Sequence, residues 1–277
     1  MNKNNYYYLI SGLPDIQPED TKTPISSIEE FKNYVSDHLY AEDRELLSFL
    51  FLPQDNKNLL KILTKEDVSD VTPGNYSTEF IEEELQGPLF LPSYMQKFIE
   101  HYYNEEEIFE GLSWRDQLSR LYYEYINETV QNEFLRQWFH FEQIISNIEV
   151  AFAAKRHDIS ISNAVVGDTE TIEALKKSNI KNDAVIREIP YINKIILLCE
   201  SDNLKDREIG IDRVKWDILN EMTTSYYFTI ENILAYMLKL MMLDRWNQLD
   251  PERGKEKIKK LIEDLQSGYD IPAEYVV

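Results

Sequence analysis

The chain has 277 residues with 50 acidic and 29 basic side chains, which give a formal net charge of −21 at pH 7. That charge disfavours nucleic acid and anionic membrane surfaces as partners, because both attract basic proteins. A hydrophobic content of 43% excludes a disordered protein. The single cysteine, Cys199, excludes an internal disulfide and fits a reducing, cytoplasmic compartment.

The first apolar segment is the stretch YYYLISGLPDI, from Tyr6 to Ile16. It lacks the small-residue cleavage pattern of a signal peptide, and it is too short to span a bilayer. Its continuous apolar character favours a buried, extended N-terminal tether over an amphipathic helix. Gly12 and Pro14 mark the turn that ends it, and a first helical turn is the alternative to a strand.

Seven of the ten prolines lie in the first third of the chain, which predicts short elements joined by turns. Overlapping capping boxes in SSIEEF, one of them starting at Ser27, predict a helix over 27–40. A second helix is predicted through AEDRELLSFLF up to Pro53, and a third over NKNLLKILT. The stretch VTPGNYS predicts a turn centred on Pro73 and Gly74.

No proline occurs between Pro92 and Pro190, so this part of the chain can hold long helices. Apolar residues spaced alternately four and three apart predict a helical seam of nearly three heptads. The seam consists of Phe134, Trp138, Phe141, Ile145, Ile148 and Phe152. Glu142, Glu149 and Arg156 repeat at seven beside it, where charges usually guide the packing of helices.

The last third contains a second long apolar stripe of helical spacing. It consists of Leu219, Met222, Tyr226, Ile230, Ile233, Met237 and Leu240. Charged residues recur along its most hydrophobic part, so no membrane-spanning helix is predicted. Asp250 and Pro251 then predict the start of a last helix, which Gly268 ends. Nearly all of the periodic signal is helical, which predicts a single all-α domain of many helices.

Known catalytic patterns are absent: there is no phosphate-binding glycine loop, no cysteine pair and no His-Glu-x-x-His motif. We therefore expect no catalytic residue, no cofactor and no metal ion. His140 lies between aromatic residues and is predicted to be a core histidine with a hydrogen bond. Cys199 is predicted to be a buried, inert thiol. An enzyme that uses carboxylates or Cys199 is the competing hypothesis.

Two acidic runs stand out, one at Glu82–Glu84 and one formed by Glu105, Glu106 and Glu107 with Glu110. Such a run is typical of a solvated surface. It also suits a rim that docks a basic partner helix, where charge would set the association rate and the orientation.

The stretch FHFEQIISNIEVAFAAKRHDIS, residues 139–160, resembles a segment of the rotor-adapter subunit of V-type ATPases, which is named C in bacterial enzymes and d in eukaryotic ones. In that segment an acidic-Asn-hydrophobic helix runs into a basic end. Asn147, Ile148, Lys155 and Arg156 occupy the matching positions, whereas Ala-Ala replaces the leucine-arginine pair of that family.

The stretch TIENILAYMLKLMMLDRWNQL resembles the late helix of the rotor-adapter subunit, through Glu231, Tyr236, Asp244 and Asn247. The N-terminal YYYLISGLP resembles instead an uncharacterised bacterial family of unknown function whose genes accompany V-type ATPase subunits. The chain is similar to that family over nearly its whole length.

These resemblances imply a non-enzymatic coupling protein. The rotor-adapter subunit is an all-helical funnel of three lobes, which here would be roughly 1–92, 93–189 and 190–277. It sits on the cytoplasmic end of the membrane rotor ring and receives the central stalk, without inserting into the membrane itself. A stand-alone helical module for protein binding or regulation is the alternative. The candidate interface residues are Glu105, Glu106, Glu107, Glu231, Tyr236 and Arg245.

Overall fold

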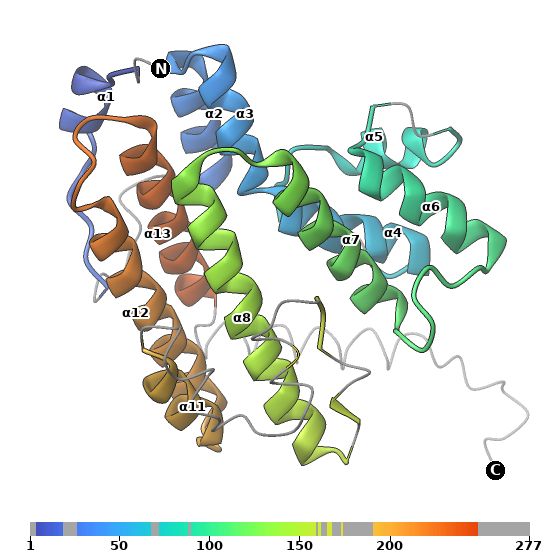
Figure 1. Ribbon diagram of the computed structural model, residues 1–277. Helices are drawn as coiled ribbons and strands as arrows, with labels where there is room; N and C mark the ends of the chain where they lie inside the picture. Colours follow the sequence, from blue (N-terminus) through green and yellow to red (C-terminus); the bar gives the residue numbers. More distant parts are fainter. Residues whose placement is uncertain are drawn as a thin grey trace, which may run out of the picture.

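Helices form all of the extended regular structure in the computed structural model, within the residues that it describes (Figure 1). These residues are 4–18, 27–67, 72–87, 90–158, 160–161, 165–167, 173 and 191–248. The helices are α1 (Tyr7–Ser11), α2 (Ile28–His38), α3 (Ala41–Phe49), α4 (Leu52–Thr64), α5 (Thr78–Glu84), α6 (Ser93–Asn104), α7 (Trp114–Thr129), α8 (Glu133–Arg156), α11 (Ile192–Glu200), α12 (Leu204–Thr223) and α13 (Ile230–Gln248). The predicted all-α class is confirmed.

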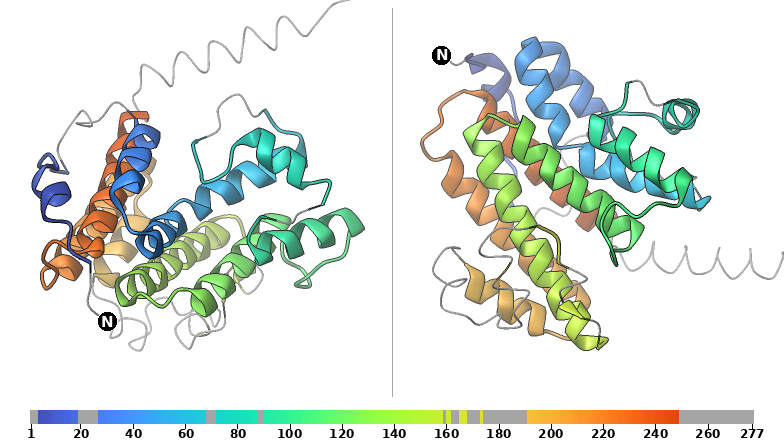
Figure 2. Two further views of the ribbon diagram at one scale, coloured as in Figure 1. Left: turned by 90° about the horizontal axis from the view of Figure 1, so that it is seen from above. Right: turned by 45° about the vertical axis from the view of Figure 1, so that its right-hand side comes forward.

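The helices gather into two groups (Figure 1 and Figure 2). In one group α4 packs against α5 and α7, and α6 packs against α7. In the other group α11 packs against α8 and α12, and α13 lies against α12 and α2. The contact between α7 and α8 joins the two groups. A three-lobed funnel is not confirmed by this arrangement, and the division into three sub-lobes stays a prediction.

Side-chain caps explain where the longer helices begin. Ser27 accepts a hydrogen bond from the backbone N–H of Glu30 at 3.0 Å, which confirms the predicted cap of α2. Asn132 accepts from the N–H of Leu135 at 3.1 Å and starts α8 in the same way. Each cap satisfies an N–H group that the first turn of a helix cannot pair internally.

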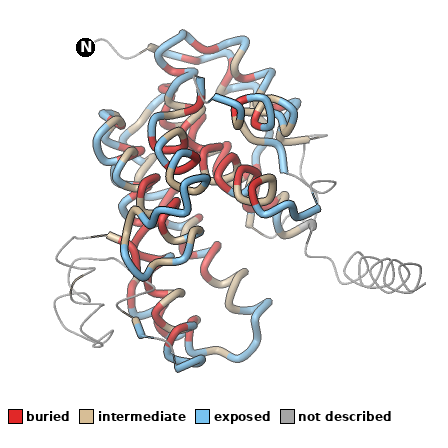
Figure 3. Tube along the Cα trace, turned by 90° about the vertical axis from the view of Figure 1, so that its right-hand side faces the viewer, coloured by how far each residue is buried: buried red, intermediate tan, exposed pale blue. Residues whose placement is uncertain are grey.

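Buried residues run through the interior of the helix assembly (Figure 3), and most of the predicted seam of α8 belongs to this core. Trp138 is 1% exposed, and Ile145 and Ile148 are fully buried. The prediction that His140 lies in the core is wrong, because its side chain is exposed. Both of its chain neighbours point inward, and one residue of a helix cannot share a face with two such neighbours.

The late apolar stripe, from Leu219 to Leu240, does not lie on one continuous helix, although its residues have helical spacing throughout. Helix α12 ends at Thr223, and α13 begins at Ile230 and packs back against α12. Phe228 in the connecting turn has a φ of 56°, in the left-handed region that no regular helix contains. The two halves of the stripe therefore face each other as partners.

The N-terminal segment forms a short helix, α1, which agrees with the alternative of a first helical turn and not with the favoured extended segment. The backbone N–H of Gly12 closes the helix by bonding the carbonyl of Tyr8 at 3.2 Å. The predicted attachment to the core is nevertheless present. The backbone N–H of Tyr6 donates to the carbonyl of Phe228 at 2.7 Å, and the Tyr6 hydroxyl donates to the buried carboxylate of Asp43. One helical turn lets Leu9 point inward while Tyr8 points to solvent.

A buried carboxylate holds the turn that follows α4. Asp55 is fully buried and accepts hydrogen bonds from the backbone N–H groups of Asn75 at 2.7 Å and Tyr76 at 3.2 Å. The side-chain amide of Asn75 donates to the second carboxylate oxygen at 2.8 Å. From α2, the Lys32 ammonium bonds the carbonyl of Gly74 at 2.8 Å. The predicted turn around Gly74 thus depends on two distant helices.

One prediction falls outside the described residues, that of the last helix, which is expected to start at Asp250 and Pro251 and to end at Gly268. None of the described helices is both long enough and apolar enough to cross a membrane.

Candidate functional site

A network of charged side chains connects α8, α12 and α13. Asp212 on α12 is only 2% exposed, and its carboxylate is ion-paired with the guanidinium of Arg245 on α13. The same carboxylate accepts a hydrogen bond from the indole N–H of Trp246 at 2.6 Å. A second carboxylate, that of Glu208, lies 3.4 Å from Arg245. Two helices that are consecutive in the chain are therefore tied by charge as well as by packing.

The network continues to α8 through Lys215, whose ammonium lies 2.6 Å from the carboxylate of Glu142. Burial alone would lower the pKa of Lys215, but Glu142, Asp212 and Glu149 outweigh this and raise it, so the charge is retained. Burial, together with Glu208 and Glu142, raises the pKa of Glu149 although Lys215 opposes the shift. Glu142 and Glu149, predicted to guide helix packing beside the seam, thus interact electrostatically with Lys215 of α12.

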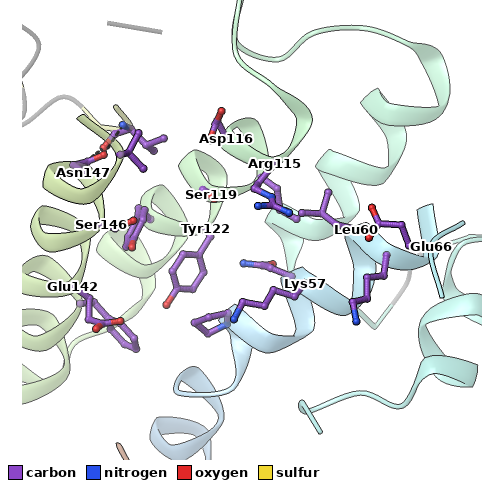
Figure 4. Close-up of a pocket in the computed structure, with 18 residues that line it drawn as sticks. Lys57, Leu60, Glu66, Arg115, Asp116, Ser119, Tyr122, Glu142, Ser146 and Asn147 are labelled. Carbon is purple, nitrogen blue, oxygen red and sulfur yellow. Dashed lines mark hydrogen bonds between the residues drawn. The ribbon is translucent and has the colours of Figure 1, made fainter. Parts of the chain in front are cut away.

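A cleft of about 440 Å³ lies next to this network, where the two helix groups meet (Figure 4). Its walls are the outward-facing side of α4, the first half of α7 and the middle of α8. Lys57 projects from α4 and Arg115 from α7, with Ser146 and Glu142 of α8 on the other side of the space. Glu142 therefore belongs to both the cleft and the charged network.

Positive charge dominates the surroundings of Lys57. Partial burial lowers the pKa of its ammonium, and the charges of Arg245, Arg115 and Lys215 lower it further, whereas Glu142 acts in the opposite direction. A cationic group in a cleft whose pKa is shifted by both burial and like charges is a physical indicator of a binding site.

The predicted acidic residues Glu105, Glu106 and Glu107 lie exposed in the turn between α6 and α7. The buried side chain of Gln117 fixes this turn, because its carbonyl oxygen accepts from the backbone N–H of Ile108 at 2.7 Å. All three carboxylates are accessible to a partner.

The other three predicted interface residues lie in α13 and make contacts inside the molecule. Glu231 is 1% exposed and accepts hydrogen bonds from Asn132 at 3.2 Å and from the Thr229 hydroxyl. Tyr236 is half-buried, and burial raises the pKa of its hydroxyl to about 12. Arg245 belongs to the network described above. A partner could reach Glu231 only if the start of α13 opened, and the interface role of these residues stays a prediction.

Cys199 is 1% exposed in α11, and burial raises the pKa of its thiol to about 12. We expect its reaction with Ellman's reagent at pH 8 to be slower than that of a free cysteine by about a hundredfold or more, because almost no thiolate is present. Measuring the rate with and without guanidinium chloride tests this, since unfolding should restore rapid labelling. Rapid labelling of the native protein would support the nucleophile hypothesis instead.

Among the described side chains, no three His, Cys, Asp or Glu residues gather closely enough to hold a metal ion. Residues 1–269 match a protein-family model described as "Protein of unknown function (DUF2764)". The chain belongs to the DUF2764 family. Comparisons with curated proteins and with solved structures found no match. The DUF2764 description assigns no activity and no partner, so it confirms the predicted uncharacterised family and leaves the link to V-type ATPases as a proposal.

Sequence reasoning did not identify Lys57, Arg115 or Asp212 of this DUF2764 protein. Lys57 and Arg115 are ordinary surface residues in their own helices, and only the packing of α4 against α7 brings them together. Asp212 interrupts an apolar face of α12, between Ile211 and Val214, and this placement is a signal that could have been noticed.

Proposed function

We propose that the chain is a non-catalytic component of a bacterial V-type ATPase or ATP synthase, similar to the rotor-adapter subunit, and that it couples the central stalk to the membrane rotor ring. It would lie on the cytoplasmic side, held at the inner face of the membrane through the complex. The two stretches that resemble the rotor-adapter subunit fall largely within α8 and α13, the helices that carry the charged network.

The observation that carries this proposal is the charged network between α8, α12 and α13. A coupling part must transmit force without bending, and single helices packed by apolar contacts alone can slide past one another. Here Lys215 fixes α12 to α8, and Asp212 fixes α12 to α13. Helix α8 has 24 residues, roughly 36 Å at 1.5 Å per residue, so the fixed unit is long as well.

The exposed turn of Glu105, Glu106 and Glu107 is the surface that we assign to the stalk. Three adjacent carboxylates would attract and orient a basic partner. The test is co-purification of tagged protein with the stalk and ring subunits from the cells that make it. We expect both sets of subunits in the wild-type eluate. Their absence, with the protein folded and expressed, would contradict the proposal.

A matched pair of variants localises the contact. Replacing Glu105, Glu106 and Glu107 together by glutamine should reduce recovery of the stalk subunits, most clearly at low salt. The control replaces three exposed acids of α2 and α3, Glu29, Glu42 and Glu45, by glutamine, which makes the same change in net charge. Equal losses in both variants would show a general charge effect and would reject this turn as the contact.

The alternative, a stand-alone protein-binding module, is favoured by one surface. Four exposed tyrosines from three separate segments lie at the α1 end of the molecule: Tyr7, Tyr8, Tyr40 and Tyr227, with exposures of 55%, 98%, 59% and 75%. Exposed aromatic residues are enriched where proteins bind one another. Recovery of one protein unrelated to ATPase subunits, lost in a Tyr8→Ser/Tyr227→Ser variant, would favour this function.

A further inference from the structure

Two cations of the cleft between α4, α7 and α8, those of Lys57 and Arg115, are neutralised by no side chain in the part of the chain that the structure describes. Within the described residues, neither Lys57 nor Arg115 forms an ion pair or a side-chain hydrogen bond. This is unusual in a chain with 50 acidic residues, where carboxylates outnumber cations. Lysine and arginine heads that share a cleft repel one another unless an anion lies between them.

The carboxylates of the cleft are engaged elsewhere. Glu142 is paired with Lys215 at 2.6 Å. Asp116 accepts a hydrogen bond from the Ser113 hydroxyl at 2.5 Å, at the start of α7. Glu66 accepts a hydrogen bond from a threonine hydroxyl at 3.0 Å. None of them is ion-paired with Lys57 or Arg115.

The rest of the lining suits an organic molecule. The volume of about 440 Å³ lies within the range of small-molecule sites, roughly 300–1,000 Å³. Leu60, Phe139 and Val150 supply apolar surface, and the hydroxyl groups of Ser119 and Ser146 supply hydrogen-bond donors. A mostly apolar lining with a few polar groups is the usual composition of a small-molecule binding pocket.

We propose that this cleft binds a small organic anion, whose phosphate or carboxylate group is held by Lys57 and Arg115. The planar guanidinium of Arg115 can donate two parallel hydrogen bonds to either group, and the Lys57 ammonium adds a point charge. The apolar part of the ligand lies against Phe139 on α8. The anion would bridge the two helix groups, so its binding would stabilise their relative position. This inference goes beyond the coupling function and does not depend on it.

Calorimetric titration of the full chain with three probes tests the proposal: adenosine 5′-monophosphate, citrate and inorganic phosphate, each at matched ionic strength. We expect saturable binding of an organic anion to the wild-type protein. A preference for the nucleotide would assign a phosphate ligand, and a preference for citrate would assign a carboxylate ligand. Failure of all three probes to bind at millimolar concentration would overturn the proposal.

Variants locate the binding. Lys57→Ala and Arg115→Ala should each weaken binding about tenfold or more, as expected for loss of a charged hydrogen bond. The controls Lys97→Ala on α6 and Arg136→Ala on α8 remove exposed cations outside the cleft and should leave binding unchanged. Equal weakening in all four variants would show binding to general surface charge and would also overturn the proposal. The side chains of all four residues reach solvent, so folding should be preserved, and circular dichroism checks it.

Discussion

Replacing Arg245 by methionine is expected to lower the free energy of unfolding by about 2–4 kcal/mol. Among the described residues, the Trp246 indole is then the hydrogen-bond donor left to the nearly fully buried carboxylate of Asp212, and Lys215, already paired with Glu142, is the cation that remains nearby. An uncompensated buried charge is far more costly than the pair that it came from. Urea denaturation followed by circular dichroism measures the loss.

Substitution of the other partner, Asp212, should lower the free energy of unfolding by less than Arg245→Met does. This difference between the two partners makes the prediction specific. Asp212→Asn leaves Arg245 with its side chain 46% exposed, so water and Glu208 can still solvate the guanidinium. The double variant Asp212→Asn/Arg245→Met should recover about 1–2 kcal/mol relative to Arg245→Met alone, as contacting residues are not additive. Lys194→Met is the control, because it breaks the exposed pair with Asp217 at 3.8 Å and should cost less than about 1 kcal/mol.

These variants also separate two roles for Arg245. If Arg245 acts by holding α13 to α12, any Arg245→Met protein that loses its partner must also be less stable than the wild-type protein. If Arg245→Met keeps its full stability but no longer recovers ATPase subunits, the structural role would be rejected in favour of the predicted interface.

The second large effect is expected at Asp55. Asp55→Ala removes the acceptor of three N–H donors in the turn after α4, and we expect a loss of about 3 kcal/mol in the free energy of unfolding at pH 4. Burial raises the pKa of Asp55 to about 6, although the hydrogen bonds from Tyr76 and Asn75 oppose the shift. The folded protein therefore holds this proton more tightly than the unfolded chain does.

The sign of the pH dependence follows from this shift. Between the ordinary pKa of 3.8 and about 6, the folded state binds more protons than the unfolded state, so the contribution of Asp55 falls as the pH rises. The difference in stability between the wild-type protein and Asp55→Ala should shrink by roughly 1–3 kcal/mol from pH 4 to pH 7. Comparing the two proteins at each pH cancels the titration of all other carboxylates. A constant difference would contradict the raised pKa.

Gly74→Ala offers an independent way to break the same turn. A Cβ atom at this position would lie 2.0 Å from the Asp55 carboxylate oxygen, which forces the turn away from α4. We expect a loss of about 1–3 kcal/mol, as for other overpacked sites. Gly87→Ala is the matched control, since no atom lies within 4 Å of its added Cβ, and it should be almost neutral.

Elements with strong local signals could be predicted from the sequence. The capping serine Ser27 and the four-three spacing of the α8 seam depend on residues within one or two turns, and both are confirmed. The position of His140 beside Phe141, a member of the seam, indicates that its side chain points away from the seam. The aromatic character of its neighbours was misleading.

Features that depend on tertiary packing could not be predicted. The late stripe keeps helical spacing through the turn that ends at Thr229, so only the left-handed backbone at Phe228 and the packing of α12 against α13 reveal two helices. The cleft combines α4 with the later helices α7 and α8, and the charged network combines α8 with the later helices α12 and α13. A side chain that is exposed on its own helix carries no local sign that another helix will cover it.

The hydrogen bond from Tyr6 to Phe228 has a consequence for the order in which the protein forms during synthesis. Phe228 is translated long after Tyr6, so this hydrogen bond can form only once the turn between α12 and α13 has been made, whereas the bond from the Tyr6 hydroxyl to Asp43 can form much earlier. A bulky protein fused before Tyr6 would already be attached to this segment when the late hydrogen bond forms. The helices α4 to α7, in contrast, can pack against one another while translation continues.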